Sequence, residues 1–181
     1  MSNLIHTPQT ATKLFFTVRL LDRNSNLLVQ QIERLRVATR KTPTSMPFEI
    51  DEIVVLPAVI HTIWTLPEGD IDFSKRWGML KSQFSHGFSK AEVCDPAKSK
   101  RREKEIWQRR FWEHHLCYDD DLAAHRYMIL TAPVQARLVE RPQQWPHSSV
   151  HRAIRLGQFD PEMSIENCHN PSAITQWRKT A

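Results

Sequence analysis

Several features that would assign a chain to a protein class are missing from this sequence of 181 residues. It has no apolar run of about 18 residues, so we expect no membrane-spanning helix, and its first residues lack the apolar segment of a secretion signal. Its cysteines, Cys94, Cys117 and Cys168, are odd in number and widely spaced. This spacing argues against a disulfide framework and predicts a reducing, cytoplasmic location. Four glycines occur, none of them in a phosphate-binding loop.

The composition is that of an ordinary globular protein with an excess of positive charge. Apolar residues make up 40% and charged residues 25% of the chain, as in typical soluble domains. A chain of this length can bury about 70% of its unfolded surface. We therefore expect one domain over residues 14–160, between tails at 1–13 and 161–181. The net charge of +5 permits a nucleic-acid partner without requiring one.

Hydrophobic patterns predict strands and helices that interleave along this domain. The expected strands cover residues 14–21, 48–56 and 59–66, and a short one is expected within 106–116. The expected helices cover residues 26–40, 122–131 and 150–156, and a further one begins after Asp72. The step at Pro57 between two strands is too short for a parallel crossover, which favours an antiparallel or mixed α+β sheet.

Helix boundaries and one buried face can be read in more detail. Asp72 is the predicted N-cap of its helix. Two prolines predict a loop over residues 41–47, and Pro133 is expected to end or kink the helix at 122–131. After Asp72, apolar residues recur at helical spacing and predict a stripe that packs into the core rather than a binding groove. The stripe consists of Phe73, Trp77, Leu80, Phe84 and Phe88.

Basic and aromatic residues are interleaved between residues 98 and 112. Arginines pair with phosphates, and aromatic rings stack unpaired bases at roughly 1–3 kcal/mol each. The pattern therefore favours nucleic-acid binding, and the alternative is a solvated basic loop at 90–105 followed by core aromatics. The basic residues are Lys98, Lys100, Arg101, Arg102, Lys104, Arg109 and Arg110, and the aromatic ones are Trp107, Phe111 and Trp112.

Two other groups of residues give only weak indications of a functional site. His114, His115 and Cys117 lie close together, but the sequence has no matching pair at zinc-site spacing, so we do not predict zinc. Ser148 and Ser149 lie in no Gly-x-Ser-x-Gly elbow, so a hydrolase is not supported.

Short motifs that follow one another in order from residue 14 to 161 resemble the bacterial REP-associated tyrosine transposases, relatives of transposases that act on single-stranded DNA. The motifs with the most matching residues are 15–18 (FFTV), 53–57 (IVVLP), 63–70 (IWTLPEGD), 106–114 (IWQRRFWEH) and 145–149 (WPHSS).

The resemblance implies a single-domain α+β fold, with a ferredoxin-like antiparallel sheet packed with helices. It also implies recognition of hairpin-forming repeats as single strands and cleavage by a tyrosine that becomes joined to a 5′ phosphate. A divalent ion, Mg²⁺ or Mn²⁺, would be held by two histidines at positions i and i+2 of a strand. Such residues point to one face, so both imidazoles can reach one ion, which offsets charge on the phosphate. A second copy of the chain is a further candidate partner.

The sequence departs from the family pattern at the positions that carry the chemistry. Val59 stands where the first strand histidine is expected, and His61 stands at the second. On the following helix, Met128 replaces the tyrosine, Ala132 a polar residue and Gln135 a lysine. The resemblance therefore predicts a DNA-binding member of the family whose cleavage is impaired or lost.

Tyr127 is the neighbour of Met128, and adjacent helical side chains point about 100° apart. Tyr127 would thus face away from the side that carries His125 and Met128, and could attack DNA only if the helix shifted. An active Mg²⁺- or Mn²⁺-dependent transposase that uses Tyr127 and His61 is one alternative. A decayed family member with no nucleic-acid role is another.

In the favoured interpretation, arginines of the basic stretch bind phosphates and one aromatic residue stacks a base. These predicted DNA-binding residues are Arg101, Arg102, Arg109, Arg110 and Trp112.

Overall fold

The computed structural model describes residues 12–88 and 106–162. Its centre is a four-stranded sheet in the order β2-β3-β1-β4, and every neighbouring pair is antiparallel. This confirms the single-domain α+β fold with an antiparallel sheet. The strands are β1 (Thr12–Arg19), β2 (Glu49–Val55), β3 (Val59–Leu66) and β4 (Trp112–His115).

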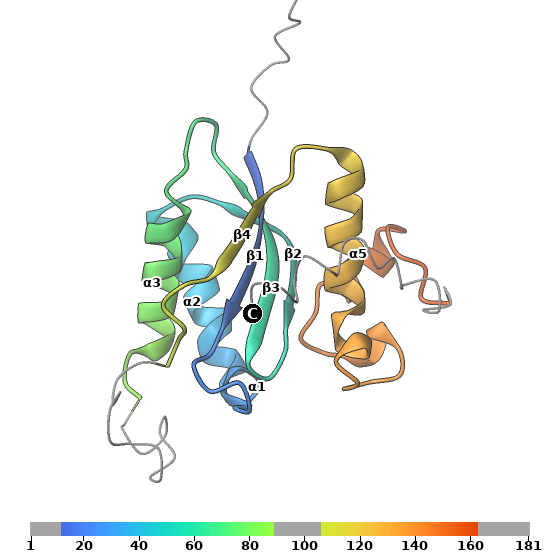
Figure 1. Cartoon of the computed structure of the whole chain (residues 1–181), viewed down its shortest axis with the longest axis horizontal. Coiled ribbons are helices and arrows are strands. Elements are labelled where there is room, and N and C mark those ends of the chain that lie inside the picture. Colours follow the sequence, from blue (N-terminus) through green and yellow to red (C-terminus); the bar gives the residue numbers. More distant parts are fainter. Residues whose placement is uncertain (1–11, 89–105, 163–181) are drawn as a thin grey trace, which may run out of the picture.

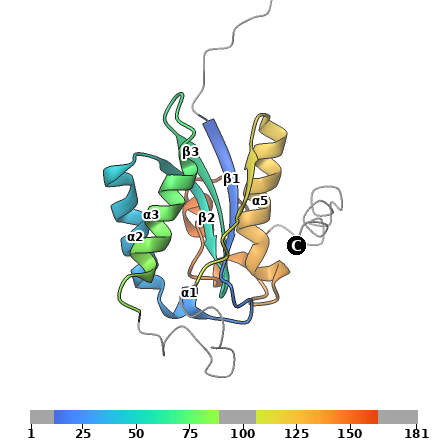
Figure 2. The ribbon, with the colours of Figure 1, turned by 60° about the vertical axis from the view of Figure 1, so that its left-hand side comes forward.

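Helices cover both faces of this sheet, with α2 and α3 on one side and α5 on the other (Figure 1, Figure 2). The helices are α1 (Leu27–Gln30), α2 (Ile32–Ser45), α3 (Phe73–Ser85), α5 (Asp119–Gln135), the 3-10 turn η1 (Pro142–Gln144) and α6 (Val150–Arg155). In the described part of the chain, no helix combines the length and the apolar character that crossing a bilayer requires.

The larger core lies between the sheet and helices α2 and α3. Alternate residues of β1 point to this side, and the ring of Phe16 packs against those of Trp64 and Trp77. The two tryptophan rings are stacked, with centroids 4.4 Å apart. Trp77, Leu80 and Phe84 are buried, which confirms that the apolar stripe of α3 belongs to the core.

The smaller core lies between the sheet and α5. Phe15 of β1, Val54 of β2 and Ile63 of β3 are fully buried there. Ile129 and Ala132 of α5 pack on them from the other side. This layer places α5 across the sheet face on which the functional positions lie.

The loop predicted over residues 41–47 and the helix end predicted at Pro133 are both wrong. Helix α2 continues through Pro43 to Ser45, and α5 continues through Pro133 to Gln135. In α2, the fully buried Thr42 donates a hydrogen bond to the Ala38 carbonyl at 2.8 Å. Burial of a continuous helix face offsets the roughly 3 kcal/mol that a proline costs.

Asp72 is the N-cap residue of α3, as predicted, but its side chain makes no capping hydrogen bond and pairs with Lys75 instead. Asp70 accepts the Asp72 backbone N–H at 2.8 Å. The Asp70 carboxylate also accepts two hydrogen bonds, at 2.6 and 3.0 Å, from the buried guanidinium of Arg76. These bonds, those from Arg76 first, lower the pKa of Asp70 to about 2. Arg76 also donates to the Pro47 carbonyl, so the pair ties the start of α3 to the chain before β2.

Replacing Asp70 by asparagine is expected to lower the free energy of unfolding by about 2 kcal/mol at pH 7. Removing one partner of a fully buried ion pair costs about 3–5 kcal/mol, and the cost is smaller here because the Asp70 side chain is 31% exposed. The folded-state pKa of Asp70 lies below its unfolded value, so its contribution is present above about pH 4. That contribution is lost as pH falls toward 2.

Urea unfolding of both proteins from pH 7 down to pH 2 measures this effect. The difference between wild type and Asp70→Asn should shrink at the acid end. Asp72→Asn, which removes an exposed pair, is the control and should leave stability unchanged. A constant difference at all pH values would contradict the role of the ionised carboxylate.

Candidate functional site

The family positions converge beneath α5. On β3, Val59 lies two residues before His61, and His61 is paired with Thr17 of β1 in the sheet register. Val59, Met128 and Ala132 all belong to the hydrophobic cluster between the sheet and α5. The places where the resemblance expects a histidine, a tyrosine and a polar residue therefore lie together, and apolar side chains fill them.

His61 is half-buried in this layer. Its Nδ1 lies 2.9 Å from the Thr17 hydroxyl, and its ring stacks on Phe15 with centroids 6.0 Å apart. Burial, together with the positive charge of Arg19, lowers the pKa of His61 to about 3, so the imidazole is neutral near pH 7. One neutral imidazole next to a valine does not fit a divalent metal held by two strand histidines.

Tyr127 lies on a different side of α5 from Met128. It packs against the cluster formed by Leu130 and residues of α6. Its ring centroid is 6.3 Å from that of Phe159. This is the orientation that helical spacing predicts, and it separates Tyr127 from the layer that holds His61. A catalytic role for Tyr127 stays a prediction.

The predicted DNA-binding arginines are only partly within the described residues. Arg109 and Arg110 are exposed, on the segment that leads into β4. Arg101 and Arg102, like the predicted loop at 90–105 as a whole, lie outside the described residues. Exposure lets Arg109 and Arg110 reach a phosphate backbone from the same stretch of chain.

Most of the aromatic residues in this stretch pack into the protein. Trp107 is buried and donates a hydrogen bond from Nε1 to Ser85 Oγ at 3.0 Å. Phe111 is half-buried against the larger core. Trp112 is half-buried against Phe15, with ring centroids 5.5 Å apart. The core interpretation therefore holds for Trp107, and the base-stacking role of Trp112 stays a prediction.

Lys81 links these aromatics to α3. Its ammonium lies 5.3 Å from the ring centroid of Phe111 and 5.8 Å from that of Trp107. It also donates to the Gln108 carbonyl at 3.1 Å, and burial lowers its pKa to about 8. These contacts hold the basic segment against α3 and fix where Arg109 and Arg110 emerge.

The structure also brings together a group that sequence reasoning missed. His114 Nε2 lies 2.7 Å from Asp121 Oδ2, and His125 Nδ1 lies 2.9 Å from Asp121 Oδ1. The ligand atoms of the three side chains lie within 4.8 Å of one another, so they form a possible metal-binding group. Burial lowers the pKa of His125, and the nearby Asp121 opposes that shift.

Of the residues considered from the sequence as possible zinc ligands, His114 belongs to this group and His115 and Cys117 do not. Cys117 is a free, exposed cysteine and does not join the group. Asp121 and His125, one helical turn apart, are the sequence signal that could have found two of its members. His114 joins them because the chain turns from the end of β4 at His115 into the start of α5 at Asp119, which brings the strand residue next to the first turns of the helix.

The motif at 145–149 covers the free edge of the sheet. The Val55 N–H donates to the His147 carbonyl, and the Ser149 N–H donates to the Ile53 carbonyl, both at 2.8 Å. Trp145 Nε1 donates to the Val55 carbonyl at 2.9 Å. An exposed edge strand can pair with another chain and promote aggregation. The segment at 145–149 bonds to the outer edge of β2 and thereby covers it.

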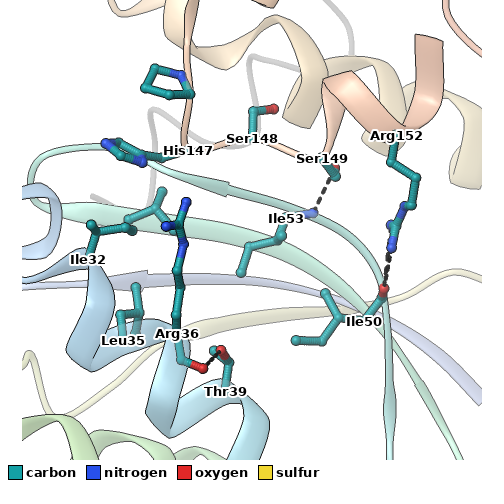
Figure 3. A pocket seen from close by; sticks show the side chains of 12 residues that line it. Ile32, Leu35, Arg36, Thr39, Ile50, Ile53, His147, Ser148, Ser149 and Arg152 are labelled. Atoms are coloured by element: carbon teal, nitrogen blue, oxygen red, sulfur yellow. Dashed lines mark hydrogen bonds between the residues drawn. The ribbon is translucent and has the colours of Figure 1, made fainter. Parts of the chain in front are cut away.

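A pocket of about 280 Å³ lies between α2 and this covering segment (Figure 3). Arg36 projects into it from α2, and His147 and Ser148 line it from the covering segment. The Arg152 guanidinium lies at one end, beside the Ile50 carbonyl. The pocket is thus a polar-rimmed hollow on the side of the sheet away from the His61 layer.

Known proteins support one family for this chain. No protein-family model matches it. It is 43% identical over 145 residues, 80% of each chain, to a REP-associated tyrosine transposase of Escherichia coli K12. It is 40% identical over 142 residues, 78% of this chain and 81% of the relative, to a Haemophilus influenzae protein assigned to the same group. The solved structure of a REP-associated tyrosine transposase bound to a REP hairpin is 39% identical. It superposes with a TM-score of 0.74, covering 91% of this chain and 92% of the other.

Proposed function

Because the chain belongs to the family of REP-associated tyrosine transposases, we propose that it binds hairpin DNA and no longer cleaves it by the family route. The observation that carries the proposal is the apolar cluster at Val59, Met128 and Ala132 on an otherwise complete scaffold. A scaffold that is kept while its reactive positions turn apolar is suited to binding without chemistry.

Several findings support the binding half. The chain carries a net charge of +5, and Arg109 and Arg110 are exposed in its most basic stretch. A structural relative that superposes over 91% of this chain was solved with a REP hairpin. Phosphate contacts from such arginines would position the strand, and hairpin shape rather than a long base sequence would be recognised.

The loss of cleavage follows from what the reaction needs. A tyrosine nucleophile and a metal act as a unit, and removing one member usually removes most of the rate. His61 lacks a second histidine two residues earlier on its strand, where Val59 stands. Its Nδ1 is engaged by Thr17. Dependence on Mg²⁺ or Mn²⁺ through His61 is therefore not expected in this chain.

The alternative, an active enzyme, requires the Tyr127 side chain to move to the side of α5 that faces His61. Its ring would have to leave the contact with Phe159 and cross α5 to reach the His61 layer. The packing of α5 opposes that rotation. Ile129, Leu130 and Thr131 are buried on different faces of the helix, and turning the helix would expose some of them.

Titration with DNA tests the binding half. The purified chain would be titrated against a labelled single-stranded hairpin from the flanks of its own gene, with an unstructured strand of equal length as control, at 50 and 200 mM salt. Tighter and salt-sensitive binding to the hairpin is expected. Equal or absent binding would favour a decayed family member, as would a gene without palindromic repeats nearby.

We also propose a cytoplasmic location. Chromosomal DNA lies in that compartment of a bacterial cell, and the odd, widely spaced cysteines suit its reducing conditions.

A further inference from the structure

We infer that His114, Asp121 and His125 form a binding site for a divalent transition-metal ion. The site is separate from the strand-histidine position, and it requires neither DNA binding nor cleavage. His114 lies on β4, and Asp121 and His125 lie one turn apart in the first half of α5. The ion would therefore join the strand at the edge of the sheet to the helix that covers it.

The donor atoms are already gathered without an ion. All of them lie within 4.8 Å of one another, and the Asp121 carboxylate bridges the two imidazoles at 2.7 and 2.9 Å. Zinc binds imidazole nitrogen and carboxylate oxygen at about 2.0–2.2 Å. Ligands around such an ion lie roughly 3.3 Å apart, so small side-chain rotations would exchange the hydrogen bonds for coordinate bonds.

The types of ligand in this group determine which class of metal ion it would bind. Two imidazoles and one carboxylate suit zinc, manganese, iron or cobalt, whereas magnesium prefers oxygen ligands and keeps its waters. The Asp121 backbone carbonyl also lies 2.9 Å from His125 Nδ1, so an ion bound at that nitrogen would replace this contact as well as the one to the carboxylate.

Exposure gives the ion access and leaves coordination positions open. The side chain of His114 is 39% exposed and that of Asp121 is 29% exposed, whereas His125 is 11% exposed at the inner end. Three protein ligands leave at least one further position for water or for an oxygen of a bound molecule.

The ring of Phe15 lies next to both this group and the strand histidine. The Phe15 ring centroid lies 4.8 Å from that of His125 and 6.0 Å from that of His61. Phe15 thus contacts both imidazoles, and His61 does not belong to the group of ligand atoms that lie within 4.8 Å of one another.

Calorimetric titration of the full chain with Zn²⁺, after treatment with a chelator, tests the site. Wild type is expected to bind one ion per chain, and Zn²⁺ should raise its melting temperature. His114→Ala and Asp121→Asn should each bind at least tenfold more weakly. His115→Ala, which alters the exposed neighbour of His114 on β4, and Cys117→Ser should bind as tightly as wild type.

Asp121→Asn preserves size and shape, so it keeps the test valid if His114→Ala does not fold. Absence of saturable Zn²⁺ binding in wild type would overturn the inference. So would affinity that is unchanged in both ligand variants, because the ion would then occupy other histidines or the cysteines. Since the probe is the metal alone, failure of hairpin binding does not affect this result.

Discussion

Replacing both Arg126 and Arg152 by methionine is expected to lower the free energy of unfolding by about 3–5 kcal/mol. The reason is Glu52 of β2, whose side chain is 2% exposed. Arg126 Nε of α5 lies 3.2 Å from one of its carboxylate oxygens, and Arg152 of α6 lies 3.8 Å from the other. Without these cations the carboxylate would remain buried and uncompensated, which is the costly case.

The effect should be strongly coupled to Glu52 itself. Adding Glu52→Gln to the double variant removes the buried charge, while the amide can still bond to Ser149, a present partner of the carboxylate. We therefore expect the triple variant to recover most of the lost stability. Urea unfolding measures all three proteins, and a triple variant no more stable than the double one would contradict the account.

A surface pair provides the control for this experiment. Arg36 and Glu33 on α2 are paired at 2.5 Å, and their side chains are 50% and 71% exposed. Exposed pairs contribute little because water solvates both charges. Arg36→Met should thus leave the unfolding midpoint nearly unchanged.

Replacing Arg109 and Arg110 by alanine is expected to weaken hairpin binding about tenfold at 0.15 M salt. Each phosphate contact to single-stranded DNA contributes about 0.7 to the slope of log K against log salt. Loss of two contacts should therefore flatten that slope by about 1.4. Titrations at several salt concentrations measure both quantities.

Arg36→Ala with Arg40→Ala is the matched control, since it also removes two exposed arginines, from α2. It lowers the net charge by the same amount, so it separates local contacts from the overall field. Equal losses in the two double variants would mean that charge alone attracts the DNA. Unchanged affinity in the first would remove Arg109 and Arg110 from the interface.

Local patterns were sufficient to predict much of the fold. Strand β3 was predicted at the bounds that the structure gives, 59–66, and the apolar stripe of α3 is core. Helical spacing alone placed Met128 and Tyr127 on different sides of α5. Such predictions succeed because periodicity follows directly from the geometry of each element.

Features that depend on tertiary contacts could not be predicted in this way. Glu52 has the sequence character of a polar strand residue, and its burial depends on arginines 74 and 100 residues further along the chain. His114 meets Asp121 and His125 only because the turn between β4 and α5 folds the helix start back toward the strand. The ends of α2 and α5 were misplaced because tertiary burial outweighed the local cost of Pro43 and Pro133.

The central claim is that this chain keeps the family scaffold but has lost the cleavage centre, and a search for a covalent DNA adduct tests it most directly. Labelled hairpin would be incubated with wild type in Mg²⁺ and in Mn²⁺ and resolved on a denaturing gel. The triple variant Val59→His, Met128→Tyr, Ala132→Asn would be run beside it, and recovered cleavage there would support these positions. The account predicts intact DNA and no adduct for wild type. A wild-type adduct that disappears in Tyr127→Phe would contradict it.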